Sequence, residues 1–157
     1  MREGMKMERK KVTIPDILQM KKQGRKITKV NLHDYPTAVL ADQAGIDIVM
    51  IGDSIGMVVL GYENTIPVTM EEMIHHAKAV VRGAKRCLVI CDMPFMSYQT
   101  SAEEAVRNAG RLMKETGVDA VKLEGGTDIQ EKVKAFDKNS LLGTVSIMGR
   151  RLCVKGI

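Results

Sequence analysis

Residues 47–54 read Asp-Ile-Val-Met-Ile-Gly-Asp-Ser, a continuous apolar run that ends in a glycine and an acid. A run without polar alternation is typical of a strand that is buried on both faces, as in a parallel sheet. Residues 88–92 and 120–124 repeat this design, since each is a short apolar segment that ends in a carboxylate. The three segments therefore predict neighbouring strands of one parallel sheet.

Helical patterns separate the predicted strands. Apolar residues recur at helical spacing in 68–81 and 101–115, and Thr69 with Glu72 and Ser101 with Glu104 have the spacing of capping boxes. Gly45 is a candidate stop for a helix over 36–44. We also predict a leading helix over 12–22, a strand over 26–32 and a helix over 127–136. Strands that alternate with helices predict a parallel sheet with right-handed crossovers.

Two architectures of the α/β class fit this order, an open doubly wound sheet and a (β/α)8 barrel. No Gly-x-Gly-x-x-Gly follows the first strand and no P-loop motif occurs, so dinucleotide and P-loop functions lose their main support. A complete barrel needs about 200–250 residues. Four βα units in 157 residues therefore correspond to half of one.

The composition excludes several other classes of function. The chain is 45% hydrophobic and 27% charged, as in an ordinary folded domain. Ten of its 24 Lys and Arg residues fall within residues 1–29, so we interpret residues 1–11 as a solvated basic leader. With only 3% aromatic residues, nucleic-acid binding is not expected. No apolar run is long enough to span a membrane and no signal peptide is recognisable, so we expect a cytoplasmic protein.

Carboxylates follow three successive predicted strands, as Asp53, Asp92 and Glu124. The ligand site of a parallel α/β fold lies at this edge of the sheet. Three converging carboxylates repel one another unless a cation joins them, and an all-oxygen set favours Mg²⁺ over Zn²⁺. The three cysteines form no Cys-x-x-Cys pair, which also disfavours zinc. The alternative is that each acid only caps the turn after its strand.

Two further polar residues stand at the same edge. Lys122 precedes Glu124 by two positions, so both side chains point to the same side of the strand. A cation there suits an anionic substrate, although a solvated lysine at a strand end explains it equally well. Ser54 follows Asp53 directly and offers a hydroxyl group at this edge.

The ordered motifs of residues 12–135 resemble those of the ketopantoate hydroxymethyltransferase (3-methyl-2-oxobutanoate hydroxymethyltransferase) family. The motifs that carry the resemblance are Asp34-Tyr-Pro-Thr-Ala, Gly52-Asp-Ser-Ile-Gly-Met, Gly61-Tyr-Glu-Asn-Thr, Pro67-Val-Thr, Asp92-Met-Pro-Phe, Ser97-Tyr and Lys122-Leu-Glu-Gly-Gly. They are long, ordered and correctly spaced, so the match is specific.

The resemblance implies a (β/α)8 barrel of the phosphoenolpyruvate/pyruvate class that assembles into a homo-oligomer, often a decamer. It implies transfer of a hydroxymethyl group from 5,10-methylenetetrahydrofolate to 3-methyl-2-oxobutanoate, a 2-oxo acid, in pantothenate biosynthesis. By position, Asp53, Asp92 and Glu124 would surround Mg²⁺. Asp53, Ser54, Asp92 and Lys122 would contact the 2-oxo acid.

The sequence also departs from the family. The general base of the family is a Glu on a later strand, which has no counterpart here, so the catalytic base stays unknown. We therefore expect a C-terminally truncated half barrel over residues 12–138, followed by a divergent tail over 139–157. Such a half barrel would leave its first and fourth strands as open edges and would show little or no turnover. The end of the first strand, Asn31-Leu32-His33, differs from the small and aromatic residues that the family has there, and we interpret His33 as structural.

Two other functions stay open on the sequence. A Mg²⁺-dependent C–C lyase or mutase of the same barrel superfamily would also bind a 2-oxo acid at the strand ends. A non-catalytic fragment that only associates with other subunits would explain the missing second half. The Asp34-Tyr-Pro-Thr-Ala and Lys122-Leu-Glu-Gly-Gly stretches favour the transferase.

Overall fold

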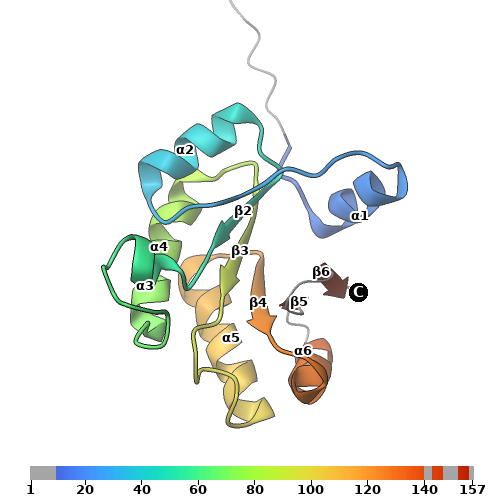
Figure 1. The fold of residues 1–157 in the computed structure, drawn as a ribbon. Helices are drawn as coiled ribbons and strands as arrows, with labels where there is room; N and C mark the ends of the chain where they lie inside the picture. Colours follow the sequence, from blue (N-terminus) through green and yellow to red (C-terminus); the bar gives the residue numbers. More distant parts are fainter. Residues whose placement is uncertain (1–9, 140–142, 147–151, 156–157) are drawn as a thin grey trace, which may run out of the picture.

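A computed structural model describes residues 10–139, 143–146 and 152–155 of the chain. One sheet runs through it, with its strands side by side in chain order (Figure 1). The strands are β1 (Lys29–Asn31), β2 (Ile48–Ile51), β3 (Leu88–Asp92), β4 (Ala120–Glu124), β5 (Gly143–Ser146) and β6 (Leu152–Lys155). Neighbours from β1 to β5 pair in parallel, and β6 pairs antiparallel to β5.

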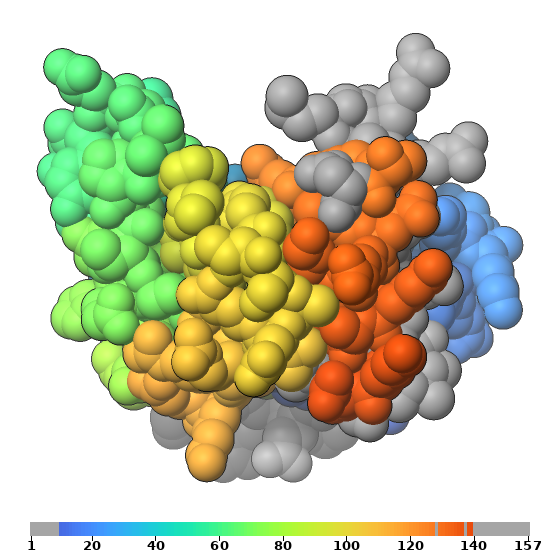
Figure 2. Space-filling model, turned by 90° about the horizontal axis from the view of Figure 1, so that it is seen from below, coloured from blue at the N-terminus to red at the C-terminus, as the bar shows by residue number. Residues whose placement is uncertain are grey.

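The helices lie on two sides of the sheet. They are α1 (Ile14–Lys22), α2 (Tyr35–Ala44), α3 (Ile55–Val58), α4 (Met70–Gly83), α5 (Ala102–Thr116), the 3-10 helix η1 (Thr127–Ile129) and α6 (Gln130–Lys138). The crossover helices α2, α4, α5 and α6 pack against one another in sequence along one face, and α1 lies on the other (Figure 1). Seen from below, the segments of α4, α5 and α6 follow one another from green through yellow to orange (Figure 2).

This arrangement distinguishes the two predicted architectures. A doubly wound sheet reverses its strand order and places crossover helices on both faces. Here the order is sequential and the four crossover helices share one face, which is the topology of a barrel. The predicted (β/α)8 class is therefore confirmed, with the observed strands forming part of the barrel wall.

Two clusters of buried apolar side chains pack on the sheet, one on each face. Side chains such as Val49, Ile51 and Leu123 face the crossover helices and belong to the larger cluster. Their strand neighbours, such as Met50 and Ile90, face the opposite way and pack against α1. All four residues of β2 are buried, as the unbroken apolar run predicts.

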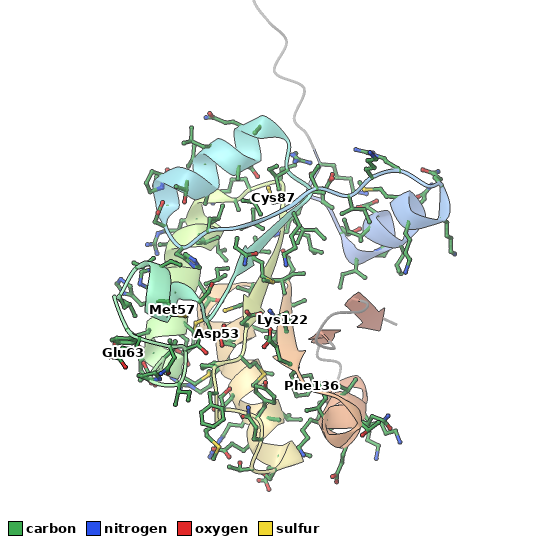
Figure 3. All side chains as sticks on the ribbon, in the orientation of Figure 1. Asp53, Met57, Glu63, Cys87, Lys122 and Phe136 are labelled. Atoms are coloured by element: carbon green, nitrogen blue, oxygen red, sulfur yellow. The ribbon has the colours of Figure 1, made fainter. Side chains whose placement is uncertain are left out.

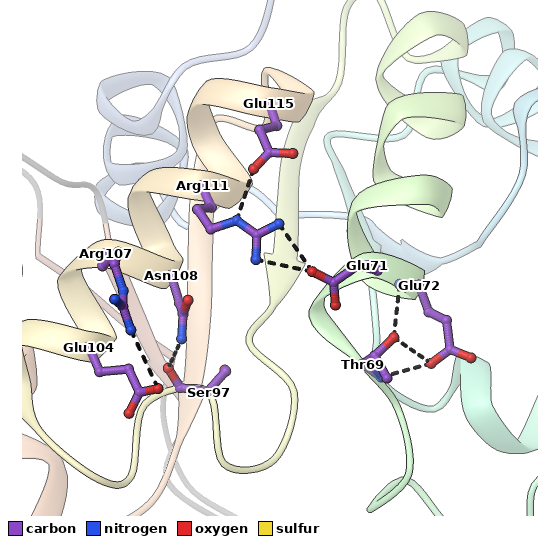
Figure 4. Close-up of polar contacts among 9 residues, drawn as sticks. All are labelled: Thr69, Glu71, Glu72, Ser97, Glu104, Arg107, Asn108, Arg111 and Glu115. Carbon is purple, nitrogen blue, oxygen red and sulfur yellow. Dashed lines mark hydrogen bonds and ion pairs between the residues drawn. The ribbon is translucent and has the colours of Figure 1, made fainter.

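Most predicted helix ends are confirmed. The Thr69 side chain accepts from the Glu72 amide, and the Glu72 carboxylate accepts from the Thr69 amide at 2.7 Å, a complete capping box (Figure 4). At α5 the prediction is only half right. Ser101 accepts from the Glu104 amide, but the Glu104 carboxylate accepts from the Thr100 hydroxyl instead.

Other predictions need correction. The strand expected over 26–32 is reduced to three residues, and α3, which directly follows Ser54, was not predicted. The expected open edge at the fourth strand is wrong, because β5 pairs with β4 within the part called a divergent tail. The first strand is an edge as predicted, since β1 pairs only with β2 among the described strands. Residues 1–9 of the predicted basic leader, which spans residues 1–11, lie outside the described residues.

No helix in the described part of the chain is both long and apolar enough to cross a membrane.

Candidate active site

The three predicted carboxylates surround one recess at the carboxyl ends of the strands. Asp53 follows β2, Asp92 ends β3 and Glu124 ends β4, and all three line a recess of about 140 Å³. Thr65 and Tyr98 are among its other lining residues. Strand pairing explains the convergence, because parallel strands in register deliver their last residues to the same edge.

Lys122 joins two of these carboxylates. Its Nζ atom lies 2.8 Å from Oδ2 of Asp92 and 3.0 Å from Oε1 of Glu124. Burial lowers the pKa of Lys122, but the charges and hydrogen bonds of the two carboxylates outweigh burial, so the pKa lies above its usual value. Lys122 is therefore a protonated cation at neutral pH, buried behind the carboxylates that line the recess.

The carboxylates carry more negative charge than this one cation balances. Burial raises the pKa of Asp92 to about 6, with Lys122 opposing the shift and Asp53 and Glu124 adding to it. Burial and the Glu124 charge also raise the pKa of Asp53. In addition, Oδ1 of Asp92 is buried and has no hydrogen-bond partner. An uncompensated buried acceptor at this point favours a cationic partner.

The residues fit a magnesium ion by chemistry, although their present positions do not form a closed ligand shell. In the described residues, no three carboxylate, imidazole or thiol groups gather closely enough to hold a metal ion. The donors are nevertheless all carboxylate oxygens, which Mg²⁺ prefers, and Asp92 keeps one oxygen unpaired. The Glu124 side chain is 53% exposed, so it has room to change its rotamer.

Ser54 stands beside the recess rather than in its lining. It precedes α3 and makes no side-chain cap to that helix. A Cβ atom on Gly52 would lie 2.9 Å from Oγ of Ser54, 3.5 Å from Oδ2 of Asp92 and 3.6 Å from Nδ2 of Asn31. The missing side chain at Gly52 thus lets three polar groups from three segments approach one point. Figure 3 labels Asp53, which follows β2, and Lys122, which lies within β4.

Sequence reasoning missed two residues of this neighbourhood. The Tyr98 hydroxyl donates to the Glu124 carbonyl at 3.0 Å and accepts from the Glu124 amide at 3.2 Å, which ties the loop after β3 to the end of β4. Asn31 reaches the same region from β1. The Ser97-Tyr98 motif was a signal for Tyr98, whereas nothing in the local sequence singles out Asn31.

His33 does not line the recess. Its backbone carbonyl lies 2.7 Å from Nδ1 of His76 on α4, and burial lowers the pKa of the His33 ring. This position is compatible with the structural interpretation of His33.

The sequence profile of a family described as ketopantoate hydroxymethyltransferase matches residues 11–149. The chain belongs to the ketopantoate hydroxymethyltransferase family. A relative from Acetivibrio thermocellus named 3-methyl-2-oxobutanoate hydroxymethyltransferase is 61% identical over 126 residues, which cover 80% of this chain and 44% of the relative. A relative of the same name from Moorella thermoacetica is 58% identical over 129 residues, which cover 82% and 48%. The chain thus spans about half the length of the curated relatives it matches.

Solved structures of more distant proteins resemble the fold of this chain. A phosphonopyruvate hydrolase, solved with oxalate and Mg²⁺, superposes with a TM-score of 0.66 at 14% identity, covering 80% of this chain and 49% of that one. A 2,3-dimethylmalate lyase of the PEP mutase/isocitrate lyase superfamily gives 0.62 at 15% identity, covering 85% and 53%. At such identities the likeness concerns the fold alone, and it agrees with the barrel topology.

Proposed function

We propose that this chain supplies the metal- and 2-oxo-acid-binding part of a hydroxymethyltransferase. The reaction moves a hydroxymethyl group from 5,10-methylenetetrahydrofolate to 3-methyl-2-oxobutanoate and gives ketopantoate. The observation that carries the proposal is a recess lined by three carboxylates, two of which pair with the buried Lys122, within a chain of this family. The decameric homo-oligomer and the cytoplasmic location expected from the sequence remain parts of this proposal.

Asp53, Asp92 and Glu124 would hold the Mg²⁺ ion. When bound, the ion supplies Lewis acidity toward the carboxylate and keto oxygens of the acid. The unpaired Oδ1 of Asp92 supports this assignment, because a buried carboxylate oxygen without a donor gains most from a cation. If the three acids were only turn caps, that oxygen would be expected to accept a backbone amide.

Lys122 would hold negative charge on the substrate. The substrate loses a proton from the carbon next to its carbonyl group, and the resulting enolate attacks the one-carbon unit. Both C–N bonds of that unit break, a water molecule supplies the hydroxyl oxygen, and tetrahydrofolate leaves. A buried ammonium group fixed by Asp92 and Glu124 is oriented before that charge develops, so little reorganisation is needed. Tyr98 and Met93, both buried, form part of the wall of the recess. We assign no general base among the described residues.

Isothermal titration of the chain with 3-methyl-2-oxobutanoate tests this proposal. We expect binding that requires Mg²⁺ and that weakens at least about tenfold in Lys122→Met and in Asp92→Asn. The first variant removes the cation that would hold the negative charge of the acid, and the second removes a carboxylate that would hold the ion. Lys78→Met is the matched control, since Lys78 is exposed on α4 and should bind as the wild type does.

The outcomes separate the proposed function from its alternatives. Binding that persists unchanged in EDTA, or that is equally strong in Lys122→Met and Lys78→Met, would contradict the site. No binding at all would favour a non-catalytic association role. Exchange of the C3 proton of the bound acid with deuterium, followed by proton NMR, would support the transferase chemistry, whereas cleavage of a C4–C6 acid would support a lyase.

A further inference from the structure

Glu124 is held less firmly than Asp92, its neighbour in the proposed metal site. The Asp92 side chain is 6% exposed and that of Glu124 is 53% exposed, although both reach Nζ of Lys122. An exposed side chain loses conformational entropy when an ion fixes it. A firmly placed backbone limits that loss, so the main-chain contacts of Glu124 matter for the site.

The Glu124 backbone lies just beyond the point where the neighbouring strand ends. The Met93 amide, directly after β3, donates to the Lys122 carbonyl at 2.9 Å. Residues two apart on a strand of a parallel sheet direct their backbone groups to the same neighbour. The amide and carbonyl of Glu124 therefore point to the side of β3, but β3 has already ended at Asp92.

The Tyr98 hydroxyl takes the place of the strand there. It donates to the Glu124 carbonyl at 3.0 Å and accepts from the Glu124 amide at 3.2 Å. A hydroxyl group can do both at once, because it carries one proton and two lone pairs. The amide and the carbonyl belong to the two peptide units on either side of Glu124. One side chain therefore fixes both units, and with them the direction in which the Glu124 side chain leaves the strand.

The loop that carries Tyr98 is itself held in place. The Tyr98 side chain is buried, and the Ser97 amide and hydroxyl donate to the Pro94 carbonyl at 3.1 and 2.7 Å. The buried Asn108 of α5 donates from Nδ2 to the Ser97 carbonyl at 2.7 Å (Figure 4). Met96 has a φ of 62°, which a non-glycine residue keeps only where its surroundings impose it. The Tyr98 hydroxyl is therefore presented to Glu124 from a preorganised frame.

We propose that Tyr98 is a positioning residue that holds Glu124 in the orientation in which its carboxylate binds the Mg²⁺ ion. The inference rests on the proposed function, and it adds a residue that acts on the ion only through Glu124. Groups that orient a metal ligand typically contribute about 10–100-fold to metal affinity. The alternative is that the hydroxyl only satisfies two backbone groups and stabilises the fold.

Isothermal titration with Mg²⁺ alone distinguishes these roles. We expect Tyr98→Phe, which keeps the ring, to weaken Mg²⁺ binding about tenfold. Tyr62→Phe is the matched control, because the Tyr62 hydroxyl also donates to a glutamate, Glu72 on α4, and lies outside the lining of the recess. Both substitutions should lower the melting temperature, since each removes a hydrogen bond, but Tyr62→Phe should bind Mg²⁺ as the wild type does.

A double-mutant cycle shows whether Tyr98 acts through Glu124. In a Glu124→Gln background, the carboxylate that Tyr98 positions is absent. Tyr98→Phe should then weaken Mg²⁺ binding less than about twofold further. A purely structural role would lower the affinity by the same factor in both backgrounds.

Hydrogen exchange of the wild-type chain, followed by NMR, provides a test that needs no variant. Coupling between two interactions is reciprocal, so bound Mg²⁺ should strengthen the contact between Glu124 and Tyr98. We expect Mg²⁺ to slow exchange of the Glu124 amide more than that of the Tyr62 amide, which donates to the Gly56 carbonyl at 2.8 Å.

Each outcome decides between the inference and the proposed function. Weaker Mg²⁺ binding in Tyr98→Phe but not in Tyr62→Phe, with the effect abolished by Glu124→Gln, supports the inference. Equal Mg²⁺ affinity in Tyr98→Phe and wild type overturns it and leaves the metal site standing. If Tyr98→Phe does not fold, equal slowing of exchange at Glu124 and Tyr62 overturns it. A wild-type chain that binds no Mg²⁺ overturns the proposed function itself.

Discussion

The ammonium nitrogen of Lys122 lies 2.8 Å from Oδ2 of Asp92, with the two side chains only 8% and 6% exposed. The pair crosses from β4 to β3, whose register places the Cα atoms of these residues opposite each other. Both side chains project from the face of the sheet that α1 also covers, since their alternate neighbours Ile90 and Ala120 pack there. The ion pair therefore forms part of the barrel interior and of the site at once.

Lys122→Met should destabilise the fold strongly. It leaves the Asp92 carboxylate buried without its cation, and removal of one partner of a buried pair costs about 3–5 kcal/mol. Urea unfolding without added metal measures this free energy. Arg25→Met is the control, because Arg25 is mostly exposed and lies 3.9 Å from Asp47, so its loss should cost less than about 1 kcal/mol.

A double variant refines the same prediction. Asp92→Asn combined with Lys122→Met removes both charges of the buried pair, so it should be more stable than Lys122→Met alone. If the two variants unfold at the same urea concentration, the cost of Lys122→Met comes from lost packing and not from the stranded charge.

Cys87 should be inert toward thiol reagents in the folded protein. Burial, together with a hydrogen bond and the charge of Asp42, raises the pKa of Cys87 to about 12. Burial also raises the pKa of Cys91. Both groups therefore stay neutral thiols near pH 8, and the thiolate is the reactive form. We expect no labelling of a Cys153→Ser variant by iodoacetamide at pH 8, and labelling at two positions in urea.

The raised pKa of Cys87 determines how its contribution to stability changes with pH. The folded state favours the neutral Cys87 thiol, so this contribution to stability is complete below the ordinary thiol pKa of 9.0. It is lost progressively as the pH rises from there toward about 12. Rapid native labelling of Cys87 at pH 8, confirmed by peptide mapping, would contradict the buried position of this thiol.

Thr69→Ala should cost about 1 kcal/mol of unfolding free energy, because it removes the side-chain acceptor that begins α4. The backbone amide of Thr69 also lowers the pKa of Glu72, with help from Tyr62. The contribution of the charged Glu72 is therefore present above the ordinary glutamate pKa and is lost as the pH falls through the lower folded-state value.

Unfolding curves at neutral and acidic pH test this capping box. Ser101→Ala is the comparison, since Ser101 caps α5 without a returning carboxylate. The difference in stability between wild type and Thr69→Ala should shrink at acidic pH, whereas that between wild type and Ser101→Ala should change less. An equal change for both variants would show that the hydrogen bond from the Thr69 hydroxyl to the Glu72 carboxylate adds nothing to the cap.

Local pattern predicted the strands and the edge where the acids meet. The apolar run of β2 and the carboxylates at Asp53, Asp92 and Glu124 are visible in the sequence because strand burial and strand ends are local properties. The pairing of Lys122 with Asp92 is not visible in the sequence, since it depends on the register between β3 and β4. Four-residue elements such as α3 are too short to show a helical period.

The close packing of α2 and α4 is another feature that the local sequence does not reveal. A Cβ atom on Gly83 would lie 2.7 Å from the Tyr35 carbonyl oxygen and 2.8 Å from Cβ of Ala38. Backbone atoms cannot move aside as the end of a flexible side chain can, so Gly83→Ala should force the helices apart. We expect a loss of about 1–3 kcal/mol.

Gly110→Ala is a matched substitution for which we expect the opposite change in stability. Gly110 lies inside α5, and a Cβ atom there would meet no atom within 4 Å. Alanine in a helix interior is favoured over glycine by about 0.5–1 kcal/mol, so this variant should be more stable than the wild type. Thermal unfolding of the two variants side by side checks the pair. A stable Gly83→Ala variant would show that α2 and α4 do not approach as closely in solution as the Tyr35 contact requires.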